Sequence, residues 1–441
     1  MSAEPASPKC GSVAQMAAAI RCGALTCLQA TEASLARIQL REPAVRAWVE
    51  FNGSAARDTA LQRDGVAVAA RGPLHGVPFG VKDIIDALPF PTGLGAASLA
   101  ALRPARTSRS VQRLDAAGAV LIGKLVTTSF AYLDPGPTRH PIDPRCTPGG
   151  SSSGSGAAVG DGMVPFALAT QAAGSTIRPA AFCGVYGFKP THGRYPLDGT
   201  LSLYPTLDTI GLIAAAAEDL ALLDGILAED AGEHVPANPL SRRIGVYRPP
   251  EWADAEPSTV RAMDNAVRQL RAAGAILLEV PPPAVASRLI HASEVVLAAE
   301  AASSFATDPF LSSLDRLALG PRLAALIERG APLLRSGYRE ALSVREDAQQ
   351  AFARIFAGVD ALLTPATPGE APEGLESTGK AIFIRGWSLM GLPCLALPAG
   401  KGPRGLPIGL QLVGGLGRDR DLLNLGVWAS GILGAGHDGG L

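Results

Sequence analysis

Helix-to-strand steps recur along this chain, and their recurrence limits its fold more than any other feature. Ser110 to Ala117 has a helical pattern, Gly118 ends it, and Ala119 to Ile122 follows as an apolar strand. Ile244 to Tyr247 predicts another strand, which an amphipathic helical pattern joins to a strand at Ala275 to Val280. We therefore predict an α/β fold with a mixed, largely parallel central sheet covered by helices on both faces.

The organisation of the chain favours one large domain over residues 1–441. Helical patterns predict helices within residues 1–70 that pack on the core, with Ser12 as an N-cap. Residues 284–356 have an almost continuous helical pattern with a break at Gly330 to Pro332. We expect this block to be an insertion that lies beside the functional site.

Composition excludes several classes of protein. Lys plus Arg (39) nearly cancels Asp plus Glu (40), so the sequence predicts no broad basic surface for nucleic acid or for an anionic membrane. No stretch approaches the ~20 apolar residues that span a bilayer, and the first residues lack a signal-peptide pattern. The six cysteines are scattered without a CxxC pair, which indicates a reduced, cytoplasmic protein.

No cluster of His, Cys, Asp and Glu residues has the spacing of metal ligands, so we expect neither a metal nor a cofactor.

Three separated motifs carry residues suited to catalysis. Gly76 to Asp83 is a short apolar segment that predicts a strand with Lys82 at its end. Thr147 to Gly156 is a Gly/Ser-rich segment that contains Ser151, and a further segment carries Ser175, 24 residues later. Amide hydrolysis needs a nucleophile, a base that takes its proton and donors aimed at the developing oxyanion, and these motifs offer all three.

In this order the motifs resemble those of the amidase-signature family, in particular its malonamidase-like branch of small-acid amidases. The resemblance implies that Ser175 is the nucleophile, that Ser151 is a relay serine held after a cis peptide bond, and that Lys82 is the base. It also implies a hydrolase that cuts the C–N bond of a small amide through an acyl-enzyme and releases ammonia or an amine. Further blocks extend the resemblance over most of the chain, at residues 188–194, 207–211, 364–370 and 405–411.

The resemblance also implies which residues surround the substrate. The main-chain N–H groups of Ala172, Ala173 and Gly174 would point at the oxyanion, and Ser152 belongs to the same substrate-binding group. Arg178 lies three residues after Ser175, and its planar guanidinium suits a substrate carboxylate. A structural ion pair beneath the loop is the alternative role for this arginine.

A lysine whose free pKa is about 10.4 accepts a proton at neutral pH only if burial or nearby positive charge favours its neutral form. Apolar residues around Lys82, namely Val77, Phe79 and Val81, would supply this burial. Taken alone, Lys82 would be an ordinary surface lysine and each serine an ordinary turn residue. Their joint occurrence in three motifs favours catalysis.

Other functions share parts of this pattern. Gly150 to Gly154 satisfies the GxSxG pattern of esterases. In a Gly/Ser-rich segment such a match arises easily by chance, so it is weak evidence for an esterase. The glutaminase subunit of a tRNA-dependent amidotransferase shares the resemblance, and it would need an obligate partner and transfer its ammonia. An inactive scaffolding relative would show no change in turnover when Ser175 is mutated.

Small amides, including those that carry a carboxylate, are the expected binding partners of the chain. The sequence leaves open whether it forms a homodimer or binds a small partner subunit.

Overall fold

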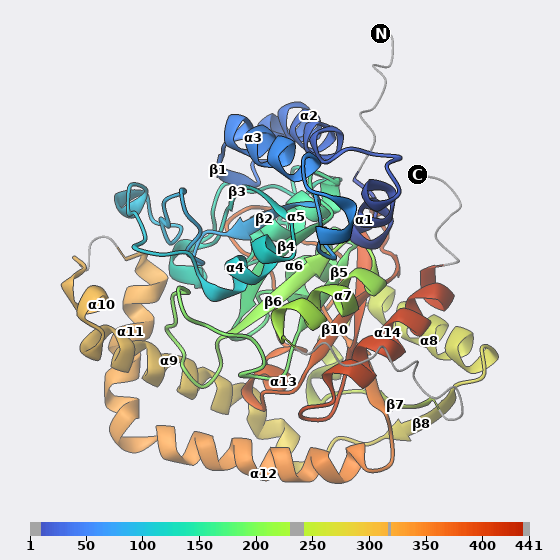
Figure 1. Ribbon diagram of the computed structural model, residues 1–441. Helices are drawn as coiled ribbons and strands as arrows, with labels where there is room; N and C mark the ends of the chain where they lie inside the picture. Colours follow the sequence, from blue (N-terminus) through green and yellow to red (C-terminus); the bar gives the residue numbers. More distant parts are fainter. Residues whose placement is uncertain (1–9, 230–241, 316–318, 435–441) are drawn as a thin grey trace.

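The computed structural model describes residues 10–229, 242–315 and 319–434 (Figure 1). Within these ranges all strands join one sheet, in the order β1-β3-β2-β4-β6-β5-β10-β11-β9-β7-β8. The strands are β1 (Trp48–Phe51), β2 (Pro78–Lys82), β3 (Val120–Leu125), β4 (Phe166–Gln171), β5 (Tyr186–Lys189), β6 (Thr209–Ala214), β7 (Arg243–Tyr247), β8 (Ile276–Val280), β9 (Ala361–Pro365), β10 (Cys394–Lys401) and β11 (Pro407–Val413).

Helices fill the sequence between the strands. They are α1 (Val13–Arg21), α2 (Cys27–Val45), α3 (Gly53–Asp64), α4 (Arg109–Ala116), α5 (Ser153–Asp161), α6 (Ile177–Cys183), α7 (Ala217–Leu227), α8 (Pro257–Ala272), α9 (Leu289–Thr307), α10 (Pro309–Ser313), α11 (Pro321–Ser336), α12 (Tyr338–Phe356), α13 (Arg385–Leu389) and α14 (Asp419–Leu433). Among the described residues, no helix is both long and apolar enough to cross a membrane.

The direction of the strands corrects one part of the prediction. Four strand pairs are parallel, namely β2–β3, β2–β4, β7–β8 and β7–β9, and the other six are antiparallel. The parallel pairs lie toward the two ends of the sheet, whereas the centre from β4 to β9 is antiparallel throughout. "Largely parallel" was therefore wrong. The short link between β10 and β11 shows why, because a turn of a few residues joins only antiparallel neighbours.

Local chemistry accounts for the element boundaries that were predicted. The Ser12 side chain accepts a hydrogen bond from the Gln15 N–H and caps α1. Gly118 follows the end of α4 with φ +97°, a backbone conformation that favours glycine. The predicted β-α-β unit is present as β7, α8 and β8, with its two strands parallel. Residues 1–9 of the predicted N-terminal region lie outside the described residues.

Two sets of helices cover the sheet. One set, α5 and α6, contacts central strands, including β4 and β10, and α2 contacts α5. The other set comprises α4, α7, α8 and α14, which contact one another in series and pack on β5, β6, β10 and β11. The α/β class of the prediction is confirmed.

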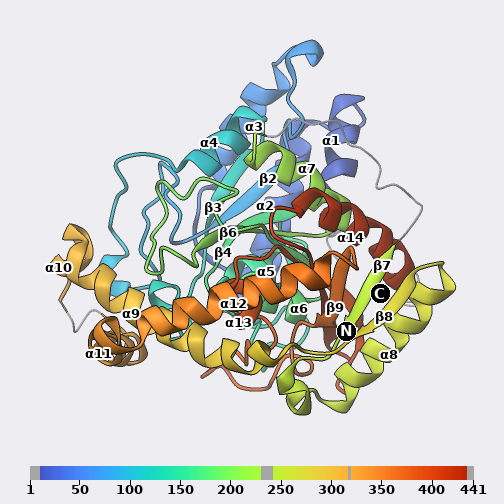
Figure 2. The ribbon, with the colours of Figure 1, turned by 90° about the horizontal axis from the view of Figure 1, so that it is seen from below.

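The helical block forms a group of its own. Figures 1 and 2 both show α9, α10, α11 and α12 on the side of the molecule away from α1, α2 and α3. The predicted break at Gly330 to Pro332 was wrong, because α11 continues through both residues. Gly330 instead lies where α11 crosses α9, and a Cβ at this position would overlap the carbonyl group of Ala298. Glycine here permits close packing of two helices.

Candidate active site

Strand β2 carries Lys82 into the interior of the protein. All five residues of the strand are buried, and parallel pairing with β3 and β4 holds it on both sides. Lys82 is 0% exposed at the end of the strand. Its Nζ lies 2.7 Å from Ser151 Oγ and 2.7 Å from Thr170 Oγ1. The amine is therefore fixed by two hydroxyl groups in a site without solvent access.

The surroundings of Lys82 favour its neutral form. Burial lowers the pKa of the amine to about 7, and the charge of Asp208 acts in the opposite direction. Both partners that hold the amine are hydroxyl groups, which can donate a hydrogen bond to a neutral nitrogen. A substantial fraction of Lys82 is therefore uncharged at neutral pH, as a base requires.

Ser151 lies in the loop before α5. The peptide bond between Gly150 and Ser151 is cis. Gly149 has φ +88°, and a Cβ there would lie 2.9 Å from the Cα of Pro179, so the loop passes too close to α6 for a side chain. The Ser151 carbonyl accepts a hydrogen bond of 3.1 Å from the Thr128 N–H. These contacts hold the Ser151 hydroxyl beside Lys82.

Ser175 lies in the loop between β4 and α6. It is half-buried and lines a cavity, and its carbonyl accepts a hydrogen bond of 3.3 Å from the Ser152 N–H. Among the described residues, its hydroxyl makes no hydrogen bond. Such bonds are often long or absent in unliganded enzymes and tighten when substrate binds. The structure thus brings Lys82 and Ser151 into contact and holds the loop of Ser175 directly against that of Ser151.

The loop from Ala172 to Ser175 offers main-chain donors to the cavity. Ala172 and Ala173 are half-buried cavity residues. A Cβ at Gly174 would lie 2.7 Å from the Cβ of Ala381, so the loop is tightly enclosed. Among the described residues, none accepts a hydrogen bond from the main-chain N–H groups of residues 172–175. These groups are available to an oxyanion.

Two further residues, which the motifs did not single out, brace this loop. Gln171 Oε1 accepts from the N–H groups of Thr176 (2.9 Å) and Ile177 (3.0 Å), and its Nε2 lies 2.9 Å from Ser388 Oγ. Ser388 Oγ in turn donates to the carbonyl of Ala173 at 2.9 Å. Gln171 adjoins the third motif, so its position gave a signal, but Ser388 comes from a distant part of the chain.

Ser152 does not lie where substrate contact was expected. It is 0% exposed, and its hydroxyl donates to the Thr170 carbonyl at 3.2 Å. It does not line the cavity that contains Ser175. The expected substrate contact was therefore wrong: its side chain points to β4, while its N–H tethers the loop of Ser175.

Arg178 supports two loops and also lines the cavity. Its Nε and Nη2 donate to the carbonyl of Gly150, at 3.1 and 2.6 Å, and its Nη1 donates to the carbonyl of Gly379. No carboxylate of the described residues pairs with it. Burial, together with the charge of Arg385, lowers its pKa to about 9. Its partners are thus main-chain carbonyls, and the alternative of a structural ion pair is not observed.

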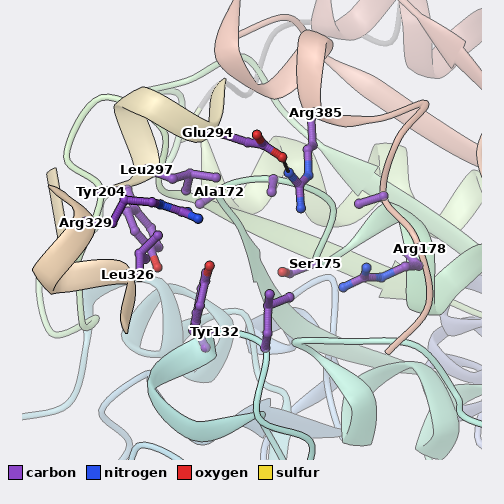
Figure 3. A pocket seen from close by; sticks show the side chains of 14 residues that line it. Tyr132, Ala172, Ser175, Arg178, Tyr204, Glu294, Leu297, Leu326, Arg329 and Arg385 are labelled. Carbon is purple, nitrogen blue, oxygen red and sulfur yellow. Dashed lines mark hydrogen bonds and ion pairs between the residues drawn. The ribbon is translucent and has the colours of Figure 1, made fainter. Parts of the chain in front are cut away.

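The cavity has a volume of about 200 Å³ and lies between the loop of Ser175 and the helices α9 and α11 (Figure 3). A second hollow of about 340 Å³ adjoins it and shares Leu133, Arg178, Glu294, Ala381 and Arg385. No group of three or more His, Cys, Asp or Glu in the described ranges is arranged to hold a metal ion. The residues that line the first cavity are Ala131, Tyr132, Leu133, Ala172, Ala173, Ser175, Arg178, Tyr204, Glu294, Leu297, Leu326, Arg329, Ala381 and Arg385.

Comparison with known proteins identifies the family. The Amidase family profile matches residues 29–423. The chain belongs to the amidase family. It is similar to a glutamyl-tRNA(Gln) amidotransferase subunit of Chloroflexus aurantiacus, with 33% identity over 93% of this chain and 94% of the relative. It is equally similar to mandelamide hydrolase of Pseudomonas putida, with 33% identity over 96% of this chain and 91% of the relative.

Solved structures of amidases share the same fold. A crystal structure of an amidase matches with a TM-score of 0.86 and 31% identity, covering 96% of this chain and all of the other. The native peptide amidase of Stenotrophomonas maltophilia matches with a TM-score of 0.80 and 27% identity, over 96% of each chain. The chain is therefore an enzyme of the amide-hydrolysing class, and the geometry above can be related to that reaction.

Proposed function

We propose that this amidase hydrolyses a small carboxylic amide through an acyl-enzyme on Ser175, with Ser151 as proton relay and Lys82 as base. The observation that carries the assignment is the buried contact between the Lys82 amine and the Ser151 hydroxyl, beside a cavity lined by Ser175. A lysine whose pKa lies near 7 matches the pH at which a general base works best.

The proposed reaction has two halves. Ser175 Oγ attacks the amide carbon and gives its proton to Ser151, which gives its own to the neutral Lys82 amine. The proton then returns through Ser151 to the leaving nitrogen, so that the C–N bond breaks and ammonia or an amine departs. Water, deprotonated by the same route, attacks the ester on Ser175 and releases the acid.

Stabilisation of the intermediate is assigned to the main chain of residues 172–175. Each tetrahedral intermediate carries a negative oxygen, and the N–H groups of this loop have no other acceptor among the described residues. The brace from Gln171 through Ser388 to the Ala173 carbonyl holds these donors in place before substrate arrives. Prearranged donors of this kind need no reorganisation during the reaction.

Arg178 has two possible roles, as a substrate ligand or as a positioning residue, and experiment can distinguish them. As a substrate ligand, it would use the Nη–H groups that remain after its three hydrogen bonds to bind a carboxylate. As a positioning residue, it would act through Gly150, the residue before Ser151. The three bonds to main-chain carbonyls favour the positioning role.

The test is Ser175→Ala in a screen of ammonia release from small acidic, aliphatic and aryl amides. We expect the variant to lose at least about 10⁴-fold in kcat on every amide that the wild type hydrolyses, with unchanged thermal unfolding. Retained turnover would refute the assignment of the nucleophile. Exposed Ser312→Ala serves as the matched control, since it removes a hydroxyl of a residue that does not line the cavity.

A second candidate function is the glutaminase subunit of a tRNA-dependent amidotransferase, which the similarity to the Chloroflexus protein favours. Such a protein would release ammonia from glutamine only when its partners are present. The stand-alone amidase is preferred because the run Ser175-Thr176-Ile177-Arg178-Pro179 resembles that of stand-alone small-acid amidases, and because mandelamide hydrolase matches over 96% of this chain. Glutamine hydrolysis that appears only after addition of partner proteins would reverse this preference.

The cellular setting is part of the proposal. All six cysteines are free, which fits a reducing compartment, and we propose a cytoplasmic enzyme. Gel filtration with light scattering would distinguish a monomer, a homodimer and a complex with a small partner subunit.

A further inference from the structure

One end of the cavity has a polar group that the proposed mechanism does not use. Tyr204 is 3% exposed and lines the cavity, and its hydroxyl has no hydrogen-bond partner among the described residues. Burial raises its pKa well above the ordinary value, so the phenol stays a neutral O–H donor. A buried polar atom normally finds a partner, and this one faces a space large enough for substrate.

Two further donors lie at the same end. Figure 3 shows the Tyr132 hydroxyl and the Arg329 guanidinium pointing into the cavity on one side of Ser175, with Arg178 on the other side. Burial raises the pKa of Tyr132 on balance, although nearby Arg329 and Arg385 act to lower it. Tyr132 also contributes to the raised pKa of Tyr204, so the two phenols lie near each other. The three side chains therefore form one group of donors, from three separate segments of the chain.

Cations outnumber carboxylates among the residues that line the cavity, although Asp208 and Glu300, outside the lining, lie close enough to Tyr204 to raise its pKa further. Arg178, Arg329 and Arg385 line it together with a single carboxylate, Glu294. Glu294 pairs with Arg385 at 2.9 Å, and Arg178 contacts main-chain carbonyls. Arg329 pairs with no carboxylate of the described residues. A guanidinium beside two phenolic donors is complementary to an anion that accepts several hydrogen bonds.

We propose that Tyr132, Tyr204 and Arg329 bind a carboxylate at the far end of the substrate's acyl chain, across the cavity from Arg178. The preferred substrates are then monoamides of dicarboxylic acids whose chain reaches from Ser175 to this group. The inference rests on the proposed function, because it takes the amide carbonyl to lie at Ser175. Leu297 and Leu326, which line the same cavity, would contact the methylene chain between the two ends.

Kinetics with matched amides test the specificity. The acidic substrates are the monoamides of glutaric and adipic acid, and the neutral controls are pentanamide and hexanamide. We expect the wild type to favour at least one acidic amide by about tenfold or more in kcat/KM, because a neutral analogue leaves the buried Tyr204 hydroxyl without an acceptor. Tyr204→Phe and Arg329→Met should each remove most of this preference, because they should lower kcat/KM for acidic amides by about tenfold more than for neutral amides.

The matched control is Arg335→Met, which removes another exposed arginine of α11 that does not line the cavity. It should leave the preference unchanged. A wild type that hydrolyses neutral and acidic amides equally well would overturn the proposal. Equal losses on both kinds of amide in Arg329→Met would overturn it as well.

A binding measurement separates failure of this inference from failure of the proposed function. Glutarate and adipate contain no amide bond, so calorimetric titration of the Ser175→Ala variant with them measures binding in the cavity without turnover. We expect saturable binding that Arg329→Met and Tyr204→Phe each weaken by about tenfold. Absence of binding, or binding that neither substitution weakens, would refute the carboxylate site even if amides are hydrolysed.

Discussion

The floor and the roof of the cavity are built in different ways. The floor, formed by β2, the loop of Ser151 and the loop of residues 172–175, holds buried groups such as Lys82 and Ser151, which are 0% and 2% exposed. The roof, formed by α9 and α11, carries longer side chains at the solvent edge, where Glu294 pairs with Arg385 at side-chain exposures of 50% and 23%. The difference suggests that the chemistry is fixed by short, rigid contacts, whereas substrate choice depends on the roof. Substitutions should separate the two.

The largest effect is expected for the floor, at Lys82. Lys82→Met keeps the length of the side chain but removes the amine, so we expect kcat to fall by at least about 10³-fold for every amide. Its pairing partners are hydroxyl groups, so the variant should remain folded. Steady-state kinetics and thermal unfolding measure the two outcomes.

Lys124 offers a matched control for Lys82, because it is also fully buried and lies on the neighbouring strand β3. It differs in its partner, the Asp83 carboxylate at 3.2 Å. Lys124→Met would leave that carboxylate buried without its cation, at a cost of about 3–5 kcal/mol in the free energy of unfolding. If Lys82→Met is destabilised as much as Lys124→Met and keeps its activity, Lys82 is structural and the comparison of floor and roof fails.

The titration of Lys82 predicts how rate depends on pH. Burial lowers its pKa to about 7, and in the proposed mechanism the neutral amine is the active form, so we expect activity to rise as pH increases through 7. We expect kcat/KM for a neutral amide to increase about tenfold per pH unit well below this pKa, and to level off about one unit above it. A profile measured from acidic to alkaline pH across this value tests the expectation. A rate independent of pH over that range would contradict the role of the amine.

Arg178 lies where floor and roof meet, and its substitution tests which of them it serves. Since it holds the carbonyl of Gly150, we expect Arg178→Met to lower kcat by about 30-fold for acidic and neutral amides alike. Arg178→Lys should not restore activity, because one ammonium cannot replace the planar fork. A loss confined to acidic amides would instead identify Arg178 as a carboxylate ligand and move it from the floor to the substrate site.

The smallest effect is expected for the brace behind the oxyanion loop. Ser388→Ala removes the link between Gln171 and the Ala173 carbonyl, and we expect kcat to fall by about threefold with little change in KM. The ratio of acidic to neutral turnover should not change. A change in that ratio would show that floor and roof are coupled through α13.

The difference between the floor and the roof of the cavity also explains how much of the structure could be predicted from the sequence. Lys82 was expected at a strand end, and β2 ends there, because strand and turn preferences act over a few residues. The helix-to-strand steps correctly predicted an α/β fold, but they lie in the outer parts of the sheet around β3, β7 and β8. Extending them to the centre produced the incorrect parallel sheet, because strand direction there depends on pairing between distant segments.

The direction in which side chains point was the second feature that could not be predicted from the sequence. Ser152 adjoins the relay serine in sequence, yet its hydroxyl bonds to Thr170, because the start of α5 turns it toward β4. Tyr204 and Arg329 belong to no motif. Arg329 is 154 residues beyond Ser175, and only the packing of α11 on α9 brings it to the cavity. No pattern of neighbouring residues carries that information.

Gly330 gives this architecture a route to new substrates. Because a side chain there would strike the Ala298 carbonyl, the crossing point of the two helices resists change. Leu326 and Arg329 lie within the preceding turn of α11, so evolution or design can exchange them while the helix axis stays anchored. Selectivity can then be changed one side chain at a time without disturbing the proposed relay of Lys82 and Ser151.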